Sequence, residues 1–220
     1  MLDPSSGDCR IECTDASTGE IIVCTFRPCF KNLMRLGSPA EIVDIFGKLF
    51  CVGLHEWLEK TPVALLPQLE HSYMRDILPA AVSVLYACYD EQDCEQFVRL
   101  VGGYAPSWAK DRILYQMGKM PIADIITIAR SLLKHGMIGE APKREGGEYS
   151  SEFNPAEFVD LVCTLLKVSQ SEAEEMTMTR FQRRFEQMYP DNKKDKAERI
   201  SREEYEQLKA ALGKGDKHGN

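Results

Sequence analysis

The chain has 220 residues, a formal net charge of −7, and 44% hydrophobic against 28% charged residues. This composition is that of an ordinary globular protein, and the acidic balance argues against binding to the phosphate backbone of nucleic acids. Apolar runs fall well short of the roughly 20 residues that span a membrane, and the N-terminus lacks the features of a secretory signal. We therefore expect a cytoplasmic protein (host cell cytoplasm if viral) with no nucleic-acid or membrane partner.

Residues 9–26 predict a β-hairpin, because two alternating runs flank a turn-rich stretch at 15–19. The hairpin region also holds half of the eight cysteines of the chain, namely Cys9, Cys13, Cys24 and Cys29. Their spacing resembles a metal-ligand layout but lacks the CxxC unit that zinc sites favour. The alternation indicates instead that the thiols are small apolar residues on one face of the hairpin. A small cysteine- or zinc-dependent protein built on this hairpin remains an alternative.

The stretch from Phe26 to Gly53 predicts two helices. Pro28 keeps Arg27 out of the helical region, which ends the preceding strand, and a short apolar helix then runs to Gly37. Ser38-Pro39-Ala40-Glu41 forms the pattern of a capping box with proline at the first helical position. The second helix carries an apolar stripe that we expect to lie in the core: Ile42, Ile45, Phe46, Leu49 and Phe50.

The sequence predicts further helices from residue 54 to 136, beginning with one from Pro79 to Tyr89. Others are expected at about 91–101, 108–118 and 121–135. The stretch 138–152 lacks periodicity and reads as a linker. We therefore expect a mainly α protein whose N-terminal hairpin packs on a multi-helix domain (1–137), followed by a linker (138–152), a small helical C-terminal segment (153–213) and a disordered tail (214–220).

The C-terminal segment begins with Asn154-Pro155-Ala156-Glu157, which repeats the capping pattern of residues 38–41. A later helix carries a Met and Phe stripe at helical spacing, formed by Met178, Phe181, Phe185 and Met188. Such a stripe either packs on its own domain or docks on a partner, since methionine adapts to irregular apolar surfaces. We take these four residues as candidate partner-binding residues.

The sequence contains none of the common catalytic or cofactor-binding motifs. The four histidines form no HExxH or HxH pair, and the sequence contains no GxGxxG, GxxxxGK[ST] or GxSxG motif. Cys29 would need a histidine close in space to act as a nucleophile, and the sequence nominates none, so a core thiol is the better interpretation. We therefore expect no enzymatic activity, no catalytic or metal-binding residues and no cofactor.

Two stretches resemble the tail assembly chaperones of long-tailed bacteriophages. The first is the Phe26-Arg27-Pro28 step, the short apolar helix, Gly37 and the capped helix that follows. The second covers residues 154–190: an apolar helix, Leu166-Lys167-Val168-Ser169, an acidic turn, the Met176-Thr177-Met178-Thr179-Arg180-Phe181 run and Tyr189-Pro190. The family coats the tape measure protein before the tail tube polymerises around it. The resemblance therefore implies a chaperone without covalent chemistry.

The same resemblance implies the tape measure protein as the main partner, bound through apolar helical stretches. Self-association and the tail tube protein are further candidate partners. A structural tail component, such as a tail completion protein, is the alternative within the same biological setting.

Overall fold

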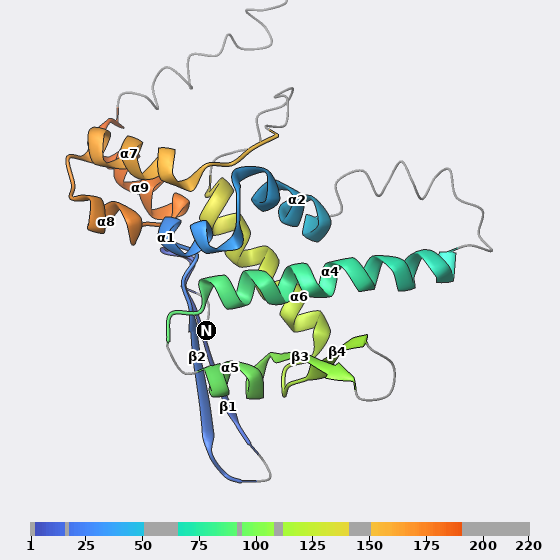
Figure 1. Ribbon diagram of the computed structural model, residues 1–220. Helices are drawn as coiled ribbons and strands as arrows, with labels where there is room; N and C mark the ends of the chain where they lie inside the picture. Colours follow the sequence, from blue (N-terminus) through green and yellow to red (C-terminus); the bar gives the residue numbers. More distant parts are fainter. Residues whose placement is uncertain are drawn as a thin grey trace, which may run out of the picture. The chain divides into compact units, whose positions relative to one another are not determined.

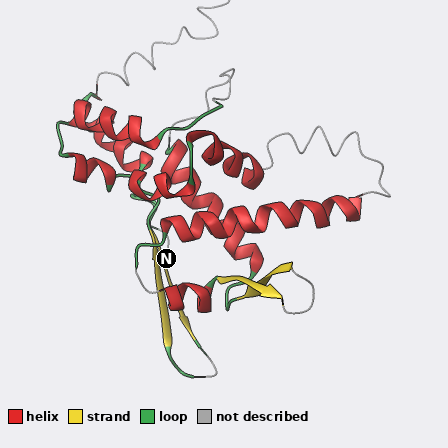
Figure 2. Cartoon of the chain, in the orientation of Figure 1, coloured by secondary structure: helices red, strands yellow, loops and turns green. Residues whose placement is uncertain are grey.

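The computed structural model describes residues 3–15, 18–50, 66–91, 94–107, 112–140 and 151–190 (Figure 1). These residues are mainly α-helical and include two short antiparallel hairpins (Figure 2). The expected fold class is therefore confirmed. Within the described ranges, no helix combines the length and apolar character needed to cross a membrane.

The first hairpin is formed by β1 (Cys9–Thr14) and β2 (Ile21–Phe26), as predicted. The strands pair antiparallel with Cys9 opposite Phe26. Because side chains alternate along a strand, every second residue lies on the same face. The buried face carries Cys9, Ile22, Cys24 and Phe26, with Ile11 and Cys13 packed against the same core. The interpretation of these thiols as apolar residues of the hairpin face is confirmed.

The chain continues through α1 (Phe30–Leu33) and a 3-10 turn (Met34–Leu36) into α2 (Pro39–Phe50). The capping box forms as predicted. The Ser38 N–H donates to Glu41 Oε2 at 2.7 Å, and the Glu41 N–H donates to Ser38 Oγ at 3.4 Å. The predicted end of this helix near Gly53 lies outside the described residues.

The apolar stripe of α2 is only partly in the core. Ile42 and Leu49 are fully buried, whereas Ile45 and Phe46 are half-buried at the edge of the core. The placement of Ile45 and Phe46 as full core residues is therefore corrected. The Phe46 ring instead stacks on Phe50, with ring centroids 4.3 Å apart.

The long helix α4 (Leu66–Cys88) crosses α6 (Ile122–Leu133), and these two helices form the centre of the core (Figure 1). Pro79 lies inside α4, so the prediction that it starts a helix is wrong. Proline removes one backbone hydrogen bond from a helix. Ile77 and Ala81 on either side of it are buried, so core packing outweighs that local loss. A shorter helix, α5 (Cys94–Leu100), follows.

A second hairpin, formed by β3 (Gly102–Ser107) and β4 (Arg112–Met117), corrects the helix predicted at 108–118. Tyr104 lies opposite Tyr115 in the antiparallel register. Two glycines allow the base of the hairpin to close. Gly102 has a φ of +106°, and a Cβ at Gly118 would lie 2.4 Å from the carbonyl oxygen of Leu100.

The predicted helix at 121–135 is confirmed as α6, which Pro121 precedes. Its apolar stripe is buried: Ile125, Ala129, Leu132 and Leu133. The helical conformation does not end at residue 135, where the predicted helix ends. The chain continues through a π-helical turn (Lys134–Ile138) and leaves the helix at Gly139.

The C-terminal described residues form α7 (Pro155–Leu166), α8 (Gln170–Glu174) and α9 (Met178–Met188). Asn154 caps α7 as predicted, because its Oδ1 accepts the Ala156 N–H at 3.2 Å. Ser169 caps α8, with its Oγ accepting the Glu172 N–H at 3.2 Å. Both α7 and α8 pack against α1.

The chain divides into a compact unit at 1–182 and a second unit at 183–220. This division differs from the expected boundary at 138–152, because residues 151–182 belong to the same unit as the first hairpin and its helices. Of the expected linker, residues 141–150 lie outside the described residues. The same holds for 191–213 of the expected helical segment and for the tail at 214–220.

Candidate protein-binding surfaces

The stripe predicted to bind a partner is not one continuous exposed surface. Met178 and Phe181 are buried, with 5% and 8% of their surface exposed, and both belong to the first unit. Phe185 is half-buried and Met188 is exposed, and both belong to the second unit. In this conformation, two of the four candidate residues are therefore inaccessible to a partner.

Polar contacts fix the first turns of α9 to the π-helical turn that follows α6. His135 Nδ1 lies 2.9 Å from the Thr179 hydroxyl. Gln182 donates from Nε2 to the Ile138 carbonyl and accepts the Glu140 N–H, both at 2.8 Å. Because the Thr179 side chain is fully buried, these contacts hold the N-terminal half of α9 in a defined position.

Aromatic rings join the two stretches that carry the resemblance. The Phe30 ring of α1 stacks on Phe158 of α7, with centroids 5.9 Å apart and 12° between the planes. The Phe153 ring also stacks on Phe158, with the ring centroids 5.1 Å apart. Lys31 pairs with Glu175 at 3.3 Å at the exposed edge. These contacts join α1 to residues that lie far from it in the chain.

The thiols of Cys29 and Cys88 are buried. Burial raises the pKa of Cys29 to about 11, and burial also raises the pKa of Cys88. A thiol with a raised pKa stays protonated near neutral pH and is a poor nucleophile. Within the described ranges, no group of three or more His, Cys, Asp or Glu residues is placed to hold a metal ion.

Among the described residues, the clearest apolar surface is on the two paired strands β3 and β4, which we call the ribbon. Its large apolar side chains are exposed to 44% at Tyr104, 72% at Ile113, 53% at Leu114 and 65% at Met117. Exposed apolar side chains that are grouped, rather than scattered, mark interaction sites. This surface was not expected from the sequence, because residues 108–118 were predicted to form a helix and β4 forms there instead.

The register of the ribbon sorts these side chains onto its two faces. One face carries Tyr104 and Pro106 of β3 with Ile113, Tyr115 and Met117 of β4. The Tyr104 and Tyr115 rings lie 5.3 Å apart, and the Tyr115 hydroxyl donates to the Val101 carbonyl. Leu114 points to the other face, opposite Ala105. A two-stranded ribbon is marginal in water by itself, so apolar residues exposed on both faces favour a partner.

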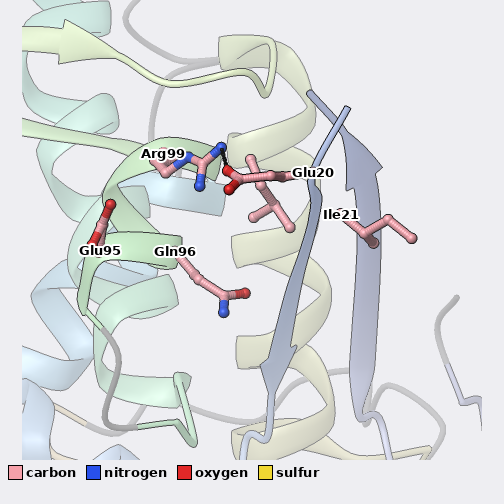
Figure 3. A pocket seen from close by; sticks show the side chains of 6 residues that line it. Glu20, Ile21, Glu95, Gln96 and Arg99 are labelled. Carbon is pink, nitrogen blue, oxygen red and sulfur yellow. Dashed lines mark ion pairs between the residues drawn. The ribbon is translucent and has the colours of Figure 1, made fainter. Parts of the chain in front are cut away.

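A hollow of about 470 Å³ lies between the first hairpin and α5 (Figure 3). Its lining residues are Glu20, Ile21, Ile22, Glu95, Gln96 and Arg99. Gln96 reaches across to the strand, where its Oε1 accepts the Val23 N–H at 3.0 Å. Arg99 closes one end by pairing with Glu20 at 2.9 Å.

A buried carboxylate supports that closed end. Asp15 has a side chain that is only 7% exposed, and it pairs with Arg99 at 3.3 Å and with Lys119 at 3.2 Å. Arg99 belongs to α5, whereas Lys119 follows the ribbon and donates its backbone N–H to the Arg99 carbonyl at 3.0 Å. Asp15 therefore ties the turn of the first hairpin to the base of the ribbon.

Residues 26–207 match the model of a protein family described as a family of unknown function (DUF6246). No curated protein and no solved structure matches the chain. The match includes α1, α2, the ribbon and α7 to α9, but only the last residue of the first hairpin.

Proposed function

The chain belongs to the family DUF6246, and we propose that it acts as a tail assembly chaperone, which binds the tape measure protein of a long-tailed bacteriophage before the tail tube polymerises. The observation that carries the proposal is the apolar surface of the ribbon. A protein that keeps apolar helices in solution must present an apolar surface of its own, and Ile113 and Met117 are the most exposed large apolar side chains of the ribbon.

The resemblance in sequence supports the same proposal from another direction. Its first stretch forms α1 and the capped helix α2, and its second stretch leads from α7 into α9. These stretches pack on one another through Phe30 and Phe158. In this proposal they build the scaffold that presents the ribbon, and the tape measure protein contacts the ribbon in the host cytoplasm.

This proposal moves the binding surface away from the stripe expected from the sequence. Met178 and Phe181 are buried and so contribute to the fold. Phe185 and Met188 keep a secondary role as candidate contacts. Helix-in-groove or helix-on-ribbon binding needs no covalent chemistry, so no catalytic residue enters the mechanism.

The test is co-expression with the tape measure protein encoded by the same genome. The wild-type chain should raise the soluble fraction of the tape measure protein several-fold. The double variant Ile113→Ser with Met117→Ser should lose this effect while its melting temperature stays close to wild type. Leu161→Ser provides the matched control, because Leu161 is an exposed apolar residue of α7, 42% exposed.

Each outcome of this test has a separate meaning. A wild-type chain that leaves the tape measure protein insoluble contradicts the chaperone function. A ribbon variant that still solubilises its partner leaves the function in place and removes the ribbon as its surface. Detection of the chain in purified virions by mass spectrometry would instead favour a structural tail component.

A further inference from the structure

The outer edge of β2, the edge that faces away from β1, is paired along part of its length. The N–H of Arg27 donates to the Cys88 carbonyl at 2.7 Å, and the N–H of Asp90 donates to the Thr25 carbonyl at 3.1 Å. These bonds form an antiparallel bridge between Phe26 and Tyr89. The backbone at 88–90 thus occupies the position of a third strand at this end of β2.

Gln96 occupies the next position along the same edge. Its side-chain Oε1 accepts the Val23 N–H at 3.0 Å, where the carbonyl of a neighbouring strand would otherwise lie. The amide of glutamine carries the same donor and acceptor groups as a peptide unit. The outward hydrogen-bonding groups of β2 are therefore satisfied by the backbone of 88–90 at one end and by the side-chain amide of Gln96 at Val23.

Beyond Val23 the edge opens into the hollow of Figure 3. In an antiparallel pair, residues alternate between those that bond to the partner strand and those whose N–H and C=O point outward. Val23, Thr25 and Arg27 bond outward, so Ile21 has the same orientation. Among the described residues, the N–H and C=O of Ile21 have no hydrogen-bond partner.

We propose that this hollow is a strand-binding site, in which an extended segment of a partner protein adds to the outer edge of β2 at Ile21. The site continues the pairing that 88–90 begins on the same edge, and its free groups are those that an extended backbone satisfies. The hollow of about 470 Å³ has room for a short segment. Two carboxylates, Glu20 and Glu95, and one guanidinium, Arg99, line the hollow, so a segment with basic ends suits the site.

This site is distinct from the ribbon, and it goes beyond the proposed function because it selects an extended segment rather than an apolar helix. Gln96 then has a second role. In the free protein it covers part of an edge that would otherwise attract other strands. A longer bound segment would displace Gln96 and take over the Val23 N–H.

The experiment uses the full chain and the peptide Lys-Val-Thr-Val-Thr-Val-Lys with blocked ends. Binding is measured by calorimetry, and the bound region by amide chemical shifts. We expect binding with the largest shifts at Ile21 and Val23. A peptide in which the central valine is replaced by proline serves as the ligand control, because it lacks one backbone N–H.

Ile21 offers a matched pair of variants. Ile21→Pro removes the outward N–H without removing a bond to β1, and it should weaken peptide binding at least tenfold. Ile21→Thr keeps the N–H and should bind within about twofold, because the Ile21 side chain is 67% exposed and points away from α5 (Figure 3). Gln96→Ala frees the Val23 N–H and should strengthen binding.

Three results would overturn the proposal. Peptide that fails to bind at millimolar concentration would contradict a strand-binding site. Equal affinity of Ile21→Pro and Ile21→Thr would show that the backbone edge is not used. Dimers of the free protein in sedimentation that Ile21→Pro abolishes would assign the edge to a second copy of this chain instead of a partner segment.

Discussion

The backbone N–H of Phe30 donates a hydrogen bond to the carbonyl of Met176 at 3.0 Å. Phe30 is fully buried at the start of α1, and Met176 precedes α9. The bond therefore satisfies one of the amide groups that the first turn of a helix leaves unpaired. It also shows that residues after the expected linker complete the packing of the first helices.

This contact changes what truncation should do. Removal of every residue after Pro142 deletes Phe158 and Met176, which leaves the Phe30 ring and its amide exposed. We expect the truncated chain to melt at a much lower temperature or to be insoluble. The control is a chain that ends at Pro190, which retains Phe158 and Met176 and should melt at a much higher temperature than the shorter chain. A truncation after Pro142 with an unchanged melting temperature would show that the two parts fold independently.

The buried and exposed residues of the α9 stripe should respond differently to mutation. Phe181→Ala should lower the free energy of unfolding by about 3–5 kcal/mol, the usual range for a buried aromatic residue. Met188 is 49% exposed, and Met188→Ala should change the free energy by no more than about 0.5 kcal/mol. Denaturant unfolding measures both. A small effect at Phe181 would return this residue to the list of partner contacts.

The stripe of α2 gives a comparable contrast inside one helix. Leu49 is fully buried, so Leu49→Ala should cost about 2–5 kcal/mol of unfolding free energy. Phe46 is half-buried and stacks mainly on Phe50, so Phe46→Ala should cost less than the 3–5 kcal/mol usual for a buried phenylalanine, or about 1–2 kcal/mol. Thermal and denaturant unfolding measure both losses. A larger loss for Phe46→Ala than for Leu49→Ala would show that Phe46, not Leu49, is the main core residue of α2.

Local patterns predicted local structure well. Ser38 and Glu41 are three residues apart, so the capping box depends only on the short segment that contains it. The prediction for the second hairpin was wrong because its structure depends on more than the local pattern. Ile113, Leu114 and Tyr115 form a continuous apolar run, which has no period and suits a strand or a helix equally. The glycines at 102 and 118 decide between them, but only once the two strands are paired.

The candidate surfaces could not be predicted from short segments, because they depend on contacts between distant parts of the chain. The position of the thiols on the apolar face of the first hairpin was predicted correctly, because strand alternation alone places them on one face. The hollow instead depends on Gln96 meeting Val23, which lies 73 residues earlier in the chain. The burial of Phe181 depends likewise on tertiary packing, since a Met and Phe stripe looks the same whether it is covered or free.

The carboxylate of Asp15 should contribute measurably to stability. Asp15→Asn places a neutral amide beside Arg99 and Lys119, so we expect a loss of about 1–3 kcal/mol of unfolding free energy. Asp44→Asn is the matched control, because Asp44 pairs with Lys48 on an exposed helix face and such pairs contribute about 0.5 kcal/mol or less. Equal losses in both variants would contradict a special role for the buried carboxylate.

The raised pKa of Cys29 predicts a loss of stability in alkaline solution. A cysteine thiol has a pKa of 9.0 when it is unperturbed, as in the unfolded chain. Burial raises the pKa of the Cys29 thiol to about 11 in the folded protein. The unfolded chain therefore releases this proton at lower pH than the folded chain, and stability falls as the pH rises from about 9 to 11. Below pH 9 both states are protonated, so Cys29 should add no pH dependence there.

Other groups also titrate in this range, so the measurement compares wild type with Cys29→Ala. The variant removes the thiol and should show a shallower decline in melting temperature between pH 9 and 11, although its melting temperature at pH 8 is lower because a buried side chain becomes smaller. Parallel declines for the two proteins would mean that the Cys29 thiol ionises equally in both states. That result would place Cys29 in contact with solvent and reopen it as a reactive thiol.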